Sequence, residues 1–147
     1  MKEYHLLAPQ KLAEVFNHVK ETMPDSFRDP NVFAQVYWAK SSMFFELGQM
    51  EGAFWFVNIS IGWKATIHIA IWGERLRHQA NTMRKMLLEV MDLLQLSKVE
   101  AYMPVTNIAV LRFAEKAGFH KEGLLLQWDC YDGQPVDIAV YSIIKEN

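Results

Sequence analysis

Residues 65–103, ATIHIAIWGERLRHQANTMRKMLLEVMDLLQLSKVEAYM, decide the fold because their hydrophobic period changes twice. Over residues 65–72 the isoleucines alternate with other side chains, which predicts a strand. A long helix is predicted next, because apolar residues recur at helical spacing at Met83, Met86, Leu87, Val90, Met91 and Leu94. Residues 98–103 are predicted to form another short strand. A strand–helix–strand unit in mid-chain predicts an α/β protein with a mixed sheet and helices on both faces.

The segments on either side of this unit add further elements. Asn107 and Gly118 mark the start and the end of one more helix, as an N-cap residue and a left-handed C-terminal cap. The other expected elements are helices over 12–23 and 32–40, a hairpin over 43–49 and 53–60, and strands over 119–129 and 136–144. No linker or repeat interrupts the chain, so we expect one domain over residues 1–147.

Composition and charge exclude several classes of protein. The chain has 147 residues, of which 51% are hydrophobic and 22% charged, and a net charge of −2, so we expect no nucleic-acid partner and no anionic membrane surface as partner. No apolar run approaches the ~20 residues of a membrane span, and the first residues do not resemble a signal peptide, so a cytoplasmic protein is expected. The single cysteine and the lack of zinc-site spacing predict no metal.

Residues 99–122, VEAYMPVTNIAVLRFAEKAGFHKE, resemble the second half of the GCN5-related N-acetyltransferase superfamily. The shared features are a helix that begins at an Asn, the phrase EKAGF over 115–119 and the pair Glu122-Gly123. This wording covers the last third of the chain, whereas the order of elements matches over roughly its whole length. Residues 54–73, FWFVNISIGWKATIHIAIWG, are in addition similar to small phage-encoded members. The resemblance implies a mixed, mostly antiparallel sheet in which the strands over 65–72 and 98–103 splay apart.

The resemblance also implies a function, the transfer of an acetyl group from acetyl-coenzyme A (acetyl-CoA) directly to an amine. In the superfamily, the N-terminus of the long helix binds the pyrophosphate of the cofactor, because unpaired N–H groups and the helix dipole favour an anion there. The pantetheine arm fills the gap between the splayed strands, where free backbone groups pair with its amides. The acceptor implied is an amine of a small molecule or peptide.

The pyrophosphate loop implied by the resemblance lies within residues 73–83. The superfamily pattern is Arg or Gln, two arbitrary residues, Gly, one residue, and then Gly or Ala. Residues 77–82, RHQANT, fit it best, a register that starts at His78 fits equally well, and neither contains a glycine. The expected cofactor-binding residues are Ile71, Arg77, His78, Gln79, Ala80, Asn81, Thr82, Asn107 and Phe113. Asn107 has the alternative of acting only as a helix cap, and Arg75 could add positive charge.

The usual proton donors of the superfamily are absent. Ala114 stands where many members have a Tyr, and Val110 where a related branch has a Ser. For a general base we expect His68 on the central strand, whose ordinary pKa near 6.5 suits the task, or Glu74 just after it. The alternatives are a structural histidine and a surface carboxylate. Further candidates are Tyr102 and Tyr141 as the base, and Trp72 and Trp128 as aromatic walls of a substrate pocket.

These departures leave a second function open. The chain could keep the acetyltransferase fold as a non-catalytic binding or assembly module, for example of the phage accessory or head-assembly type. A stable oligomer with its cleft filled by side chains would favour the module, and coenzyme A that co-purifies with the protein would favour the enzyme. A monomer or a homodimer is expected in either case.

Overall fold

The computed structural model describes residues 3–145 and contains a seven-stranded sheet in the order β1-β2-β3-β4-β5-β7-β6. The strands are β1 (Tyr4–Leu6), β2 (Met43–Leu47), β3 (Gly52–Val57), β4 (Lys64–Ile71), β5 (Lys98–Pro104), β6 (His120–Tyr131) and β7 (Gln134–Ile144). The pair β4 and β5 is parallel and every other neighbouring pair is antiparallel. The predicted mixed, mostly antiparallel sheet is therefore confirmed.

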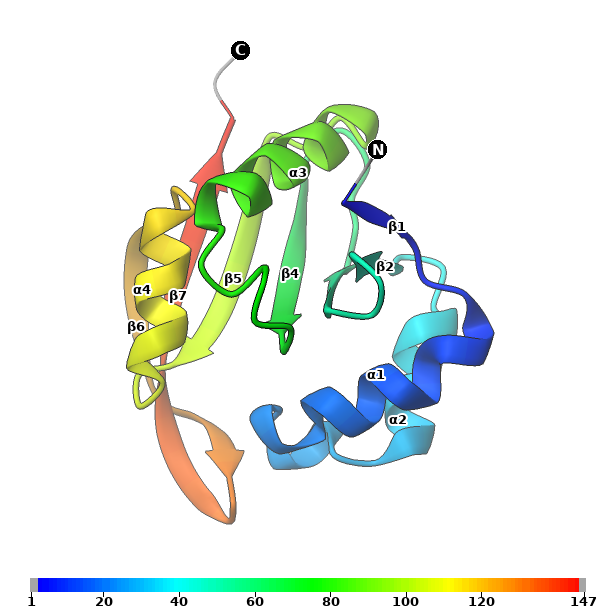
Figure 1. Cartoon of the computed structure of the whole chain (residues 1–147). Helices are drawn as coiled ribbons and strands as arrows, with labels where there is room; N and C mark the ends of the chain where they lie inside the picture. The colour runs from blue at the N-terminus through cyan, green and yellow to red at the C-terminus, as the bar shows by residue number, and fades with distance from the viewer. Residues whose placement is uncertain (1–2, 146–147) are drawn as a thin grey trace.

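Helices cover both faces of this sheet, as predicted. They are α1 (Leu12–Val19), α2 (Pro30–Trp38), α3 (Ala80–Leu93) and α4 (Ile108–Lys116), with 3₁₀ turns η1 (Pro9–Lys11), η2 (Lys20–Thr22) and η3 (Asp25–Phe27). In Figure 1, α3 and α4 lie on one side of the strands, and α1 and α2 lie together at the other end of the molecule. Helix α3 connects the two parallel strands, which is the strand–helix–strand unit expected from residues 65–103.

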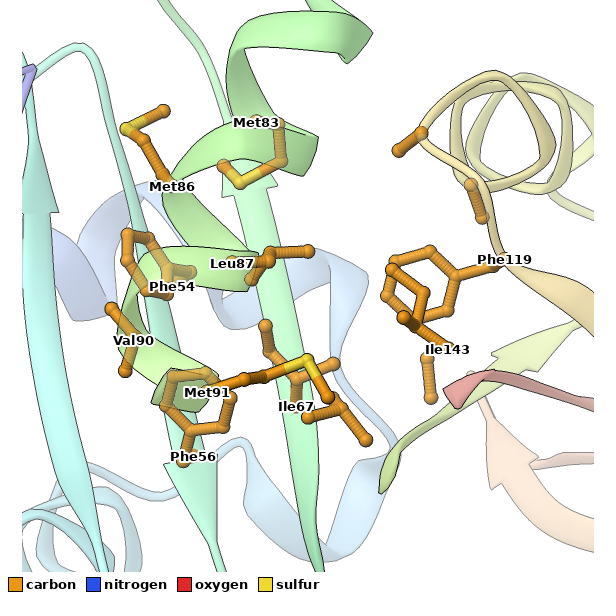
Figure 2. Packing of buried hydrophobic residues seen from close by; sticks show 14 of the residues in the cluster. Phe54, Phe56, Ile67, Met83, Met86, Leu87, Val90, Met91, Phe119 and Ile143 are labelled. Carbon is orange, nitrogen blue, oxygen red and sulfur yellow. The ribbon is translucent and has the colours of Figure 1, made fainter. Parts of the chain in front are cut away.

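Two separate hydrophobic cores follow from this layering. The larger one joins α3 and α4 to one face of the sheet, and the smaller one joins α1 and α2 to the opposite face of β2 and β3. Figure 2 shows the larger core, with Met83, Leu87 and Met91 of α3 packed above Ile67 of β4. This packing explains the alternation in the sequence of β4. One face of the strand meets α3 and is apolar, while His68 points to the other face.

The ends of the elements follow local signals. Asn107 caps α4, since its side-chain oxygen accepts a hydrogen bond from the Val110 N–H at 3.2 Å. Gly118 takes the left-handed conformation (φ +95°) just after that helix, and the Phe119 N–H bonds back to the Ala114 carbonyl at 2.9 Å. Both predicted caps are confirmed.

Strand β1 is the strand that the sequence did not predict. It has three residues and lies at the edge of the sheet, where it pairs with β2 from Tyr4↔Leu47 to Leu6↔Phe45. A segment this short carries no measurable period, so only its pairing with β2 defines it. No helix between residues 3 and 145 is long and apolar enough to cross a membrane.

Candidate functional site

The parallel strands β4 and β5 separate along most of their length. They pair only where they begin, from Lys64↔Lys98 to Thr66↔Glu100. Beyond this point each strand stays paired on its outer side, β4 with β3 and β5 with β7. The inner edges of both strands therefore present backbone groups that face a wedge instead of a partner strand. The splayed pair implied by the resemblance is confirmed.

A cavity of about 1250 Å³ runs through this wedge from one face of the sheet to the other. Its first part, which we call the helix half, lies beside α4 and the loop before α3 and is lined by Ile71, Arg77, His78, Ala80, Asn107, Val110, Arg112, Phe113, Ala114 and Lys116. Its second part, the hairpin half, lies beside α2, η3 and the end of β6 and includes Phe27, Gln35, Trp55, His68, Tyr102, Trp128, Asp129 and Tyr131. The cavity thus joins two chemically different spaces.

The N-terminus of α3 is open to an anion. Helix α3 begins at Ala80, its cap residue Gln79 makes no capping hydrogen bond with its side chain, and its first turn contains no acidic residue. The Gln79 amide is used elsewhere, as it donates to the Arg75 carbonyl at 3.0 Å and accepts from the Thr82 hydroxyl at 3.1 Å. The first backbone N–H groups of α3 are thus free of side-chain caps, and the helix dipole adds partial positive charge. Because residues 80–82 have helical conformation, the missing glycines do not disturb this geometry.

The cavity brings together six of the nine expected cofactor-binding residues. These are Ile71, Arg77, His78, Ala80, Asn107 and Phe113. Gln79, Asn81 and Thr82 do not line the cavity and would contribute through the backbone of the first helical turn. Arg75 does not reach the cavity either, because Glu3 and Glu51 both bind its guanidinium at 2.7 Å. The positive side chains of the helix half are instead Arg77 on the loop and Arg112 and Lys116 on α4, and the sequence did not single out the last two.

His68 lies in the hairpin half, on the face of β4 opposite α3. Its ring stacks on Trp55 at 5.4 Å between centroids with an interplanar angle of 17°. Burial lowers the pKa of His68 to about 4, so the imidazole is uncharged at neutral pH. An uncharged ring can accept a proton or a hydrogen bond, but with this pKa it is a weaker base than the ordinary value of 6.5 suggested.

The other expected catalytic residues lie in different places. Glu74 is exposed on the loop before α3, outside the cavity lining, and pairs with Arg77 at 3.4 Å. Tyr102 lines the cavity and its hydroxyl donates to Glu100 at 3.3 Å, while Tyr141 is buried under α4 in the larger core. Ala114 and Val110, where the superfamily has its proton donors, both line the cavity. The positions are therefore in place, but without a hydroxyl group.

The two tryptophans that were expected in a substrate pocket lie in different places. Trp128 lines the hairpin half of the cavity. Trp72 does not, because its ring stacks on His18 of α1 at 4.1 Å and its indole N–H donates to the Met50 carbonyl at 2.7 Å. The proposed pocket role of Trp72 was wrong, since the residue joins α1 to the turn between β2 and β3.

The sequence pattern did not indicate Asp129 and Tyr131, which line the hairpin half at the end of β6. The register of β6 against β7 shifts between Leu125 and Asp129, where Gln127 has a φ of +49°. Such a bulge changes which side chains face the cavity and cannot be recognised from alternation alone. The usable signal was a single acid between two aromatic residues, Trp128 and Tyr131, at the end of a strand.

The tip of the β6–β7 hairpin is fixed to η3, on the far side of the hairpin half. The Asp25 carboxylate accepts the backbone N–H groups of Asp132 and Gly133, each at 2.8 Å. Arg28 pairs with the Asp132 carboxylate at 2.5 Å. These contacts place residues more than 100 positions apart side by side and hold the hairpin tip against η3.

Comparison with known proteins gives a clear answer for the fold. No protein-family model and no curated protein match the sequence. Solved structures do: spermidine N-acetyltransferase from Vibrio cholerae, in complex with CoA and spermine, is 18% identical, with a TM-score of 0.78 over 97% of this chain and 94% of that one. A candidate phosphinothricin N-acetyltransferase is 17% identical, with a TM-score of 0.80 over 98% of both chains. Ribosomal-protein-S5-alanine acetyltransferase from Vibrio fischeri is 12% identical, with a TM-score of 0.75 over 100% of this chain and 96% of that one.

At these identities the likeness establishes the fold, which is that of the GCN5-related N-acetyltransferases. The implied architecture is therefore confirmed. None of the three proteins is described as phage-encoded, so the similarity to small phage members stays a prediction.

Proposed function

We propose that the protein transfers the acetyl group of acetyl-CoA to the nitrogen of an amine. The observation that carries the proposal is the open wedge between β4 and β5, which begins beside the uncapped N-terminus of α3 and continues to the opposite face of the sheet. The similar solved structures carry the names of acetyltransferases, and one of them holds CoA. Our assignment of the two halves is that the helix half binds the cofactor and the hairpin half the amine.

The residues present fit acetyl-CoA. Its phosphates would be held by the first N–H groups of α3, with Arg77, Arg112 and Lys116 as cationic partners at the same side of the cavity. Its pantetheine amides would pair with the free inner edges of β4 and β5. When bound, acetyl-CoA supplies a thioester that an uncharged amine can attack with release of the thiolate. The protein positions the two groups on either side of the wedge, which lowers the entropic part of the barrier.

His68 has a specific part in this proposal. Its imidazole faces the hairpin half and is uncharged at neutral pH, so it can accept a hydrogen bond from the incoming amine and orient the nitrogen. We assign no side chain as general acid, because Ala114 and Val110 have no proton to donate. Glu74 is placed outside the cavity, so we give it no catalytic part. The nitrogen loses one proton to water as the amide bond forms, and the released thiolate takes one proton from water, so no net proton is gained or lost.

The open cavity favours an enzyme over the non-catalytic module. A fold retained only for binding or assembly was expected to have its cleft filled by side chains, whereas this wedge holds a cavity of about 1250 Å³. The acceptor we propose is an amine of a small molecule or peptide. A cytoplasmic monomer or homodimer remains a prediction.

Titration calorimetry of acetyl-CoA into the full chain tests the proposal. We expect saturable binding, a rise in the melting temperature with cofactor, and release of free CoA thiol when an accepted amine is added. The absence of binding at millimolar cofactor would remove the enzyme and leave the binding module.

A further inference from the structure

The hairpin half has an electrostatic character of its own. Asp129 is the only carboxylate among the described residues that line the cavity. The arginines and the lysine of the lining, by contrast, all belong to α4 or to the loop before α3, in the helix half. The hairpin half therefore offers one negative charge and no positive one.

The Asp129 carboxylate is available to bind a cation. Its side chain is half-buried, and no described residue forms a hydrogen bond or an ion pair with its carboxylate. Burial raises the pKa of Asp129, and burial together with the nearby charge of Asp129 raises the pKa of Tyr131 to about 12. A carboxylate that has lost water without gaining a partner is unfavourable, and a bound ammonium group would offset that cost.

The surroundings of Asp129 are aromatic. Phe27 of η3 and Trp128 and Tyr131 of β6 line the same part of the cavity. Phe27 and Trp128 are 37% and 60% exposed, so their rings remain accessible to a ligand. Aromatic faces attract organic cations and also bury apolar groups. The fixation of the hairpin tip by Asp25 and Arg28 brings η3 and β6 together and so builds this space.

We propose that Asp129 binds the ammonium group of the acceptor, which loses one proton to water before its nitrogen attacks the thioester, and that the acceptor is a cationic amine with an aromatic or other apolar body and no acidic group. The inference rests on the proposed acetyltransferase function and adds the class of acceptor. An amine that also carries a carboxylate would place a second negative charge beside Asp129, in a half of the cavity without a cation to receive it. Such acceptors are discriminated against.

Binding of phenethylamine to the CoA-loaded protein, measured by calorimetry, tests the inference without relying on turnover. Asp129→Asn is expected to weaken the binding of phenethylamine at least tenfold, to leave the affinity for CoA unchanged, and not to lower the melting temperature. Glu14→Gln, which removes an exposed carboxylate of α1 outside the cavity, is the matched control and should change neither affinity. In the unchanged protein, phenylalanine should bind at least tenfold more weakly than phenethylamine.

The outcomes separate the two proposals. Equal binding of phenethylamine by the Asp129→Asn variant and the unchanged protein overturns the inference, and so does equal binding of phenylalanine and phenethylamine. If the unchanged protein does not bind CoA, the proposed function fails, and the same titration without CoA then decides whether Asp129 is a cation site.

Discussion

Replacing Asn81 by aspartate adds one negative charge where the phosphates of the cofactor are proposed to bind. Asn81 is exposed at the second position of α3, and its side chain forms no hydrogen bond with any residue between 3 and 145. The substitution keeps the shape of the side chain. A carboxylate in the first turn of a helix stabilises it by about 0.3–1 kcal/mol, so the melting temperature should rise by roughly 1–4 °C in a chain of this size.

The same charge should weaken the binding of acetyl-CoA. Over the length of one helical turn, about 5.4 Å, two unit negative charges repel by about 0.8 kcal/mol in water and about 3 kcal/mol at the effective dielectric of a protein surface. These energies correspond to a loss of affinity between about 4-fold and 200-fold. Stability and cofactor affinity are therefore expected to change in opposite directions.

Calorimetry for acetyl-CoA and thermal unfolding without ligand measure the two effects separately. Asn31→Asp is a matched control, because Asn31 is exposed at the second position of α2 and does not line the cavity. It should leave acetyl-CoA affinity unchanged. Unchanged affinity in a folded Asn81→Asp variant would refute the placement of the phosphates at α3.

Three further predictions concern stability and the hairpin. Gly118→Ala should lower the free energy of unfolding, measured in urea, by about 1–2 kcal/mol, because φ is +95° there and an added Cβ would lie 3.0 Å from the Arg84 side chain. An unchanged free energy of unfolding would contradict the role of Gly118 as the left-handed cap of α4. Burial alone would raise the pKa of Glu46, but hydrogen bonds led by that from Lys11 outweigh it and hold this pKa below its ordinary value near 4.3. The stability contributed by Glu46 should thus be present above its ordinary pKa near 4.3 and be lost as the pH falls below that value, and Glu46→Gln should show a smaller fall in acid unfolding curves. Asp25→Ala should speed amide hydrogen exchange at the hairpin tip without changing acetyl-CoA affinity, and unchanged exchange would show that other contacts hold the tip.

The sequence predicted the elements that carry a long, regular period. Helix α3 repeats its apolar residues over four turns, and β4 alternates over eight residues, so both are recognised without tertiary information. The caps at Asn107 and Gly118 act on their own helix and are likewise local. The splayed strands came from the resemblance, because no local pattern states that two strands separate.

The missed features depend on contacts between distant segments. The bulge before Asp129 is defined only by the register of β6 against β7, and the attachment of the hairpin tip to Asp25 joins residues over 100 positions apart. The lowered pKa of His68 also arises from burial against Trp55, which belongs to another strand. Pattern alone placed His68 correctly on its face of β4 but could not give the strength of the base.

The two halves of the cavity belong to different parts of the chain and to different cores. The helix half is supported by α3, α4 and the larger core, whereas the hairpin half draws on η3, α2 and the end of β6. Substitutions around Asp129 or Phe27 can therefore accumulate without disturbing the packing under α3. During evolutionary divergence, or in the laboratory, substitutions can therefore change the specificity for the amine while the binding site for the acyl donor stays the same.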